Sequence, residues 1–292
     1  MIEVGQYGAF GVNCVGMARD PFPLSFSAQE AAGCWQLRAA AVRAVEVADL
    51  LTGATANDTV VVVDLATNSF LDEKYRQLPL ARIAAAQGVE PVVHPRGEWA
   101  AGASGLGEEF LVLRKRELGG FLGDDWAPYE LGLVDLPAPP GAEELDQLAL
   151  AVGTASSDEP LLPQLPLSQW YFSGHDDCYL WLETRNAALP SLLLARLLAL
   201  AAGAALLAET GAEPVRVPEP EPSLAAALLA ENPHWVGAVG EVTAEAVRVD
   251  LVPSKRPWRL GERVPEAAGR YARLGRPDGG WTLGQGAPAA AA

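Results

Sequence analysis

The stretch WYFSGHDDCYLWLETRNAALPSLLLARLLALAAGAALLAETGAEPVRV, residues 170–217, carries the strongest structural signal in this chain. It contains a polar cluster, an aromatic segment, the longest apolar run of the sequence and a short β-like segment at its end. Between residues 187 and 208 the only charge is Arg196, and leucine and alanine, which both favour helix, dominate. The run therefore predicts a helix that is apolar on every side.

Residues at both ends of this run are suited to start and stop a helix. Asn186 can act as the N-cap, Pro190 is tolerated in a first turn, and Gly211 is a typical stop. The run is also almost long enough to cross a membrane, but Arg196 would then lie near the middle of the bilayer, at a cost of about 2.5–3.5 kcal/mol. We therefore expect a buried core helix and no membrane span, with a membrane span as the alternative.

Outward from this stretch, helical patterns alternate with short apolar strands. A capping box at Ser27 and Glu30 precedes a helix that we expect over residues 28–51. Further helices are expected over residues 72–87, 142–152 and 223–230, and strands over residues 59–65, 89–94, 109–116, 131–136 and 246–252. Residues 218–222, PEPEP, predict a stiff acidic linker.

The alternation of helices and strands indicates an α/β layered fold. We expect one domain over residues 1–252, and two pseudo-repeats, residues 1–140 and 141–252, are an alternative organisation. Residues 253–292 are polar and rich in glycine, proline and arginine. They predict a C-terminal extension that is partly disordered.

The charge of the chain limits its partners. Its 292 residues include 21 Lys and Arg against 37 Asp and Glu, which gives a formal net charge of −16. No basic patch stands out, so nucleic acid and anionic membrane surfaces are not expected partners, whereas a basic protein surface is. The three cysteines, Cys14, Cys34 and Cys178, are widely spaced and odd in number, which argues against disulfides and structural zinc. With no signal peptide recognised at the start, we expect a cytoplasmic protein.

Two residues are candidates for catalysis. Cys34 is expected in the first turns of a helix, where the helix N-terminus would lower the pKa of a thiol and make it a nucleophile. An inert packing cysteine is the alternative. His175 precedes Asp176 and Asp177, so it is either a general base, a metal ligand or a hydrogen-bonded turn histidine. The other two histidines are isolated in the sequence, and we expect no metal site.

A glycine-rich loop over residues 102–107 is a candidate for ligand binding through its backbone N–H groups. Gly105 and Gly107 are its candidate residues, together with Asp176 and Asp177. The loop has no Lys-Ser/Thr pair, which excludes a P-loop. An ordinary surface loop is the alternative.

Several of these stretches resemble the β-ketoacyl synthases, the condensing enzymes of the thiolase superfamily. In that family a nucleophilic cysteine opens a buried helix that leads to a buried strand, and Cys34 followed by TVVVVDLATNSFLDE is similar. A glycine-rich turn running into a strand is matched by GLGEEFLVLRKRE, residues 105–117. His175 takes the place of the histidine in the family's His-Gly-Thr motif, and LLALAAGAALLAE, residues 197–209, resembles the helix after the second catalytic histidine.

The resemblance covers residues 33–209 and departs from the family at its catalytic positions. Asp176-Asp177 stand where the family has Gly-Thr, and Arg196-Leu197 stand where it has the Gly-His of its second histidine. The glycine-rich loop near the family's C-terminus and its long N-terminal portion have no counterpart here. The resemblance therefore implies a shortened and catalytically degenerate member.

The fold implied is a thiolase-like α/β/α layered architecture with a mixed sheet and a central buried helix. The function implied is residual acyl-transfer or thioesterase chemistry at Cys34 with His175, without a cofactor. The alternative is a non-enzymatic acidic binding protein, such as an immunity or assembly factor that masks a basic partner. Under either hypothesis we expect a protein partner, in a homo- or heterodimer.

Overall fold

The structure is a computed structural model with α/β architecture. It describes residues 1–5, 24–40, 42, 44–64, 80–95, 109–122, 130–154, 169–175, 179–211, 214–257, 269–276 and 279–286. The chain divides into two compact units: unit 1 comprises residues 1–29, 38–42 and 188–292, and unit 2 comprises residues 30–37 and 43–187. This division differs from the single domain expected over residues 1–252.

Unit 1 combines two helices with antiparallel strands. Its helices are α6 (Leu189–Thr210) and α7 (Pro222–Glu231). Its strands are β1 (Ile2–Val4), most of β2 (Leu24–Ala31), β10 (Val215–Val217), β11 (His234–Val242), β12 (Ala246–Pro253), β13 (Arg270–Gly275) and β14 (Trp281–Gly284). One sheet has the order β14-β13-β12-β11-β2, and β1 pairs with β10 in a separate two-stranded sheet.

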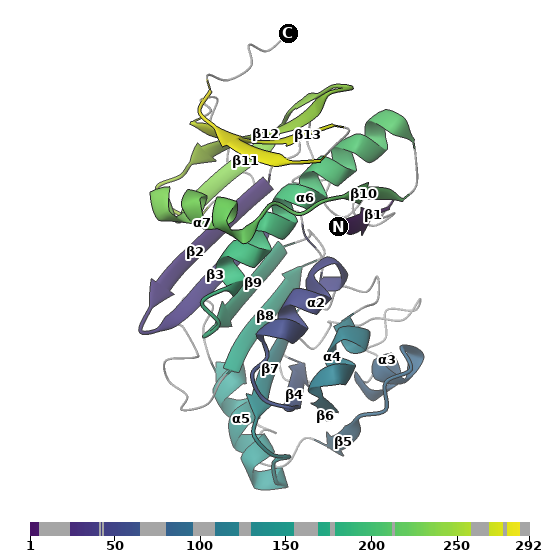
Figure 1. Cartoon of the computed structure of the whole chain (residues 1–292). Coiled ribbons are helices and arrows are strands. Elements are labelled where there is room, and N and C mark those ends of the chain that lie inside the picture. Colours follow the sequence, from purple (N-terminus) through teal and green to yellow (C-terminus); the bar gives the residue numbers. More distant parts are fainter. Residues whose placement is uncertain are drawn as a thin grey trace. The chain divides into compact units, whose positions relative to one another are not determined.

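The apolar run forms α6, as the sequence predicts. The N-cap is Ala188, which makes no side-chain capping bond, and not the expected Asn186. Pro190 lies in the first turn, and Gly211 ends the helix with a left-handed φ of 63° while its N–H donates to the Leu207 carbonyl at 2.9 Å. α6 packs against β11 and β12 of the sheet and also against β1, β10 and α7 (Figure 1). These neighbours explain why the helix is apolar on every side.

The core of unit 1 gathers around the second half of α6. Its fully or nearly buried members are Ala199, Ala202, Leu206, Val217, Val247 and Leu274. The helix approaches β1 closely at Gly203, where an added Cβ would lie 2.8 Å from Val4 Cβ and 3.2 Å from Val217 Cγ2. A side chain at this position would therefore push β1 and β10 away from the helix.

α6 is the one helix of the described ranges that is long and apolar enough to cross a membrane. Most of its surface is buried among the strands and helix of unit 1. One such helix, mostly buried, agrees with the core helix that the sequence predicts. A cytoplasmic location stays a prediction.

Unit 2 combines helices with antiparallel strands. The helices are α2 (Ala44–Ala54), α3 (Leu80–Ala86), α4 (Lys115–Leu122) and α5 (Ala142–Thr154). The strands are β4 (Thr59–Asp64), β5 (Val92–Pro95), β6 (Glu109–Arg114), β7 (Glu130–Leu136), β8 (Gln169–His175) and β9 (Tyr179–Thr184), in the order β9-β8-β7-β4-β6-β5. The remaining strand, β3 (Cys34–Ala40), begins in unit 2 and ends in unit 1.

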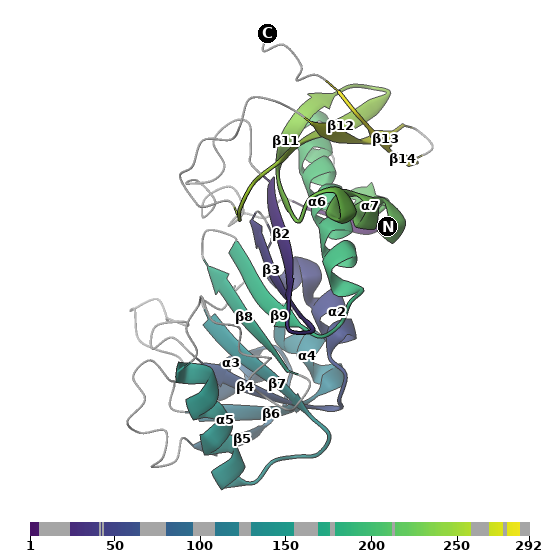
Figure 2. The ribbon, with the colours of Figure 1, turned by 90° about the vertical axis from the view of Figure 1, so that its left-hand side faces the viewer.

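The sheet of unit 2 is covered on both faces. Residues 60–63 of β4 are fully buried, which requires cover on each side and confirms the strand predicted from TVVVVDL. Figure 2 shows α5 on one face of the sheet and α2 and α4 on the other. Asp135 Oδ2 on β7 accepts hydrogen bonds from the N–H groups of Ala56 and Asn57, at 2.9 and 2.8 Å, and so holds the turn that leads from α2 into β4.

The pairings that the structure describes among β1, β2 and β4–β14 are antiparallel. The α/β class expected from the sequence is confirmed. The thiolase-like layering, with its mixed sheet, stays a prediction.

The helix expected over residues 28–51 is wrong in its first half. This range contains the end of β2, then β3 and only afterwards α2. The residues between the two strands, Ala32 and Gly33, have φ values of 53° and 74°, and two successive left-handed residues form a tight strand-reversing turn. Ser27, expected to cap a helix, instead lies on β2 with its hydroxyl beside His234.

The strand expected over residues 109–116 ends early, at Arg114, because α4 begins at the next residue. Glu117 in the first turn of α4 accepts hydrogen bonds from the Arg114 N–H and from its guanidinium, both at 2.8 Å. Burial alone would raise the pKa of Glu117, but these bonds and the positive charge of Arg114 hold it below its ordinary value. The Glu117 side chain thus stabilises the junction between the end of β6 and the start of α4.

The range expected to be a polar extension, residues 253–292, contributes strands to unit 1. β13 pairs with β12, and β14 pairs with β13. Trp281, the first residue of β14, packs partly buried against the core around α6. The described part of this range therefore belongs to the sheet.

Candidate functional site

Cys34, the expected nucleophile, lies at the start of β3 and not at the start of a helix. Its side chain is fully buried and forms no disulfide. Burial raises the pKa of this thiol, while Arg185 opposes the shift and Glu183 adds to it. Without a helix N-terminus to stabilise a thiolate, Cys34 has the environment of a protonated packing residue. The expectation that Cys34 opens a helix, which the family resemblance used, is therefore wrong.

His175, the expected base, is the last residue of β8, and its backbone pairs with Tyr179 on β9. Its side chain is outside the described part of the chain. The expected binding residues Asp176, Asp177, Gly105 and Gly107 also lie outside the described residues. A pairing of Cys34 with His175 therefore stays a prediction.

A serine and a histidine that are far apart in the sequence meet in unit 1. Ser27 on β2 and His234 on β11 are directly opposite in the antiparallel register, and Ser27 Oγ lies 2.6 Å from His234 Nδ1. Both side chains are buried, and burial lowers the pKa of His234, so that its neutral form is favoured. A nucleophilic serine must reach its substrate, so this buried pair is suited to a structural hydrogen bond.

The same corner of unit 1 is fixed by an amide side chain. Asn232, which follows α7, donates from Nδ2 to the backbone oxygens of His234 and Ser254, the latter at 3.0 Å. These bonds tie the end of α7 to β11 and to the end of β12. The sequence signals a turn here with Asn-Pro, but only the strand register reveals that Ser27 and His234 are partners.

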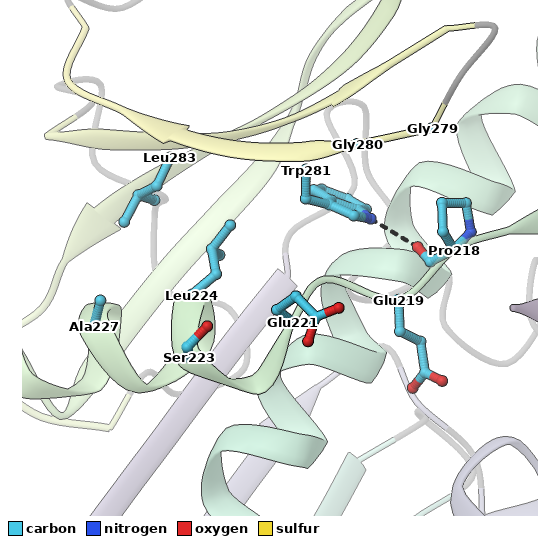
Figure 3. Close-up of a pocket in the computed structure, with 10 residues that line it drawn as sticks. All are labelled: Pro218, Glu219, Glu221, Ser223, Leu224, Ala227, Gly279, Gly280, Trp281 and Leu283. Atoms are coloured by element: carbon cyan, nitrogen blue, oxygen red, sulfur yellow. Dashed lines mark hydrogen bonds between the residues drawn. The ribbon is translucent and has the colours of Figure 1, made fainter.

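The described residues of unit 1 also form an open groove of about 650 Å³ (Figure 3). We call it the acidic groove. It lies between the acidic linker (residues 218–222), the first two turns of α7 and the start of β14. Its lining residues are Pro218, Glu219, Glu221, Ser223, Leu224, Ala227, Gly279, Gly280, Trp281 and Leu283.

Two glutamates are the charged residues of this lining, which contains no lysine, arginine or histidine. Glu219 Oε1 accepts a 2.6 Å hydrogen bond from Nε of Arg196, which lies on α6. Glu221 is exposed, and its carboxylate has no partner among the described residues. Trp281 Nε1 donates to the Pro218 carbonyl at 2.7 Å, which fixes the indole against the linker (Figure 3).

The sequence does not predict this groove. Sequence reasoning singled out the acidic linker as a segment but assigned it no site. It missed Trp281 because this residue falls in the range taken for a polar extension. In the described ranges, no group of three or more His, Cys, Asp or Glu side chains is placed to hold a metal ion.

Comparison with known proteins provides no relative: no family model matches the chain, and neither a curated protein nor a solved structure does so. The resemblance to β-ketoacyl synthases stays a prediction.

Proposed function

We propose that this protein is a non-enzymatic binding protein that holds a basic protein partner. The observation that carries the proposal is the acidic groove, whose described lining has Glu219 and Glu221 as its charged residues and contains no basic side chain. The net charge of −16 adds a long-range attraction that would speed the encounter with a basic chain and disfavour acidic ones.

The environment of Cys34 favours binding over acyl-thioester chemistry. Attack on a thioester needs a thiolate that the substrate can reach, whereas Cys34 is fully buried and its pKa is raised by burial. Ser27 and His234, the one hydroxyl and histidine found in contact among the described residues, are buried as well. A catalytically degenerate protein, which the family resemblance implies, agrees with this proposal.

The charge also favours a heterodimer over a homodimer. Association of two copies would bring two charges of −16 together, and their repulsion opposes self-association at low ionic strength. A basic partner would instead be attracted to this chain by the same long-range electrostatic force. We therefore propose that this chain is the acidic member of a heterotypic complex.

Binding to charge-matched peptides tests the proposal. Fluorescence anisotropy would compare a dye-labelled arginine-glycine repeat peptide with its glutamate-glycine counterpart, both mixed with the full chain. We expect saturable binding of the arginine peptide only. Raising the salt from about 0.01 M to about 0.15 M shortens the Debye length from about 30 Å to about 8 Å and should weaken binding at least about tenfold. Failure of the arginine peptide to bind at low salt would refute the proposal.

A thioester assay tests the competing enzymatic function. The wild type and Cys34→Ser would be incubated with a short-chain acyl-coenzyme A, and the release of free thiol would be followed. We expect no release above the rate without protein. Release by the wild type that is lost in Cys34→Ser would show an acyl-transfer enzyme and overturn the binding proposal.

A further inference from the structure

The composition of the acidic groove points to the side chain that it would hold, an inference that rests on the proposed binding function. We propose that the groove receives an arginine of the basic partner. The guanidinium would lie between the Glu221 carboxylate and the Trp281 indole. An apolar residue next to that arginine would pack against Leu224 and Leu283.

The indole of Trp281 is held in a position that leaves it available to a ligand. Its only hydrogen-bond donor, Nε1–H, is taken by the Pro218 carbonyl at 2.7 Å. This bond fixes the orientation of the ring, which is only partly buried and lines the groove. An ordered indole with its N–H satisfied can offer its π face, and a guanidinium is the cation that stacks best on such a face.

Among the described residues, the charges in the groove leave one carboxylate without a counter-ion. Glu219 is neutralised by Arg196, whose Nε lies 2.6 Å from Glu219 Oε1. Glu221 is the N-cap residue of α7 but its side chain does not cap the helix, and its backbone oxygen accepts the Leu224 N–H instead. With no partner in the part of the chain that the structure describes, the Glu221 carboxylate can accept a bidentate pair of N–H bonds from one guanidinium.

The remaining lining suits an apolar neighbour of the cation. Leu224 and Ala227 on α7 and Leu283 on β14 face the same groove, beside the glutamates (Figure 3). A volume of about 650 Å³ falls within the range of about 300–1,000 Å³ typical of ligand sites, and holds more than one side chain. A segment in which arginine adjoins leucine or a similar residue would use both parts of the groove.

Other occupants fit less well. An anion would meet two carboxylates, and a purely apolar segment would bury Glu221 without a partner, which costs free energy. Lysine supplies the charge, but its ammonium does not stack as a plane on the indole and cannot form the two-pronged contact with a carboxylate. Charge and shape complementarity therefore both favour arginine.

The test uses one short peptide in three versions. A dye-labelled peptide carries Leu-Arg-Leu within a glycine-serine sequence, and its arginine is replaced in the other two by lysine or by citrulline, the neutral analogue of arginine. Anisotropy titrations would use the full chain, Glu221→Gln and Glu245→Gln. Glu245 is exposed in the turn between β11 and β12, outside the groove lining, so this control removes the same charge elsewhere in unit 1.

We expect Glu221→Gln to weaken binding of the arginine peptide about tenfold and Glu245→Gln to change it less than about twofold. Replacement by citrulline should weaken binding to the wild type at least about tenfold, and replacement by lysine about threefold or more. Thermal melts of both variants that match the wild type would establish that folding is unchanged.

Three results would overturn the inference. Equal weakening by Glu221→Gln and Glu245→Gln would show that general surface charge and not the groove binds the peptide, and the proposed function would still stand. Equal binding of arginine and citrulline would exclude a cation site, and equal binding of arginine and lysine would exclude the stacked guanidinium. Absence of binding by both this peptide and the arginine-glycine peptide would instead refute the proposed function itself.

Discussion

Arg196 Nε donates a hydrogen bond to Glu219 Oε1 across 2.6 Å, and this contact joins the middle of α6 to the acidic linker. The two partners differ in burial: the Arg196 side chain is 8% exposed and the Glu219 side chain is 30% exposed. The ion pair lets a charged residue lie within the apolar helix, because the guanidinium is compensated where water has little access. The same contact positions one wall of the acidic groove.

Because of this difference in burial, we expect substitution of Glu219 and substitution of Arg196 to lower the free energy of unfolding by different amounts. Glu219→Gln would remove the Glu219 charge from beside a buried guanidinium and should lower the free energy of unfolding by about 2–4 kcal/mol. Arg196→Met would fill the apolar surroundings and leave a glutamate that can reach water, at a cost of about 1 kcal/mol. Urea denaturation followed by circular dichroism measures both. Equal losses would contradict the assigned asymmetry.

Ala202 tests whether α6 is the core of unit 1. Ala202 is fully buried, so Ala202→Asp would place an unpaired charge among apolar side chains and should unfold unit 1. Ala208→Asp is the matched control, because Ala208 is exposed on the same helix. The control should melt within a few degrees of the wild type. A folded Ala202→Asp variant with an unchanged melting temperature would show that the helix is not core.

Cys34 should react slowly with iodoacetamide in the folded protein. Its thiol is fully buried and burial raises its pKa, so little thiolate is available at neutral pH. Mass spectrometry of the cysteine peptides would show rapid labelling of Cys34 only after urea is added, and His175→Ala should not change the native rate. Fast labelling that depends on His175 would restore the catalytic hypothesis.

His234 should make unit 1 less stable in mild acid. In the unfolded chain it titrates near its ordinary pKa of about 6.5, and in the folded chain burial lowers that pKa. Between the two values the unfolded state binds more protons, so the free energy of unfolding falls as the pH drops below about 6.5 and this loss levels off below the folded pKa. Above the unfolded pKa the stability is fully present.

Denaturation curves of the wild type and His234→Gln, collected from about pH 7.5 to about pH 5, isolate this effect from the titration of carboxylates. The wild type should lose stability relative to the variant as the pH falls. Parallel curves for the two proteins would refute the assignment.

The elements predicted correctly from the sequence are those with strong local signals. α6 and β4 were found because a long Leu/Ala run and a short β-branched run indicate their type without knowledge of their neighbours. The β2–β3 pair was missed because Ser27 and Glu30 match a helix start, whereas Ala32, a residue seldom found at positive φ, forms the turn. The local sequence pattern does not indicate that Ala32 adopts the left-handed conformation.

The acidic groove could not be predicted because it is assembled by long-range packing. The Trp281 indole reaches the Pro218 carbonyl 63 positions earlier in the chain, through the pairing of β14 with β13. The chemistry candidates taken from the sequence, by contrast, were chosen for their side-chain type and their neighbours in sequence. The structure shows that Cys34 is fully buried, so its environment does not suit nucleophilic catalysis.

The discontinuity of unit 1 has a consequence for the order in which the chain folds during synthesis. β1 emerges from the ribosome first, yet its partner β10 is 213 positions later, with Glu3 opposite Arg216. The continuous stretch of unit 2, residues 43–187, is complete well before that. Unit 2 can therefore form while β1 still lacks β10 and β2 still lacks β11, and these unpaired strand edges are open to pairing with other nascent chains until α6 and the strands after it have been translated.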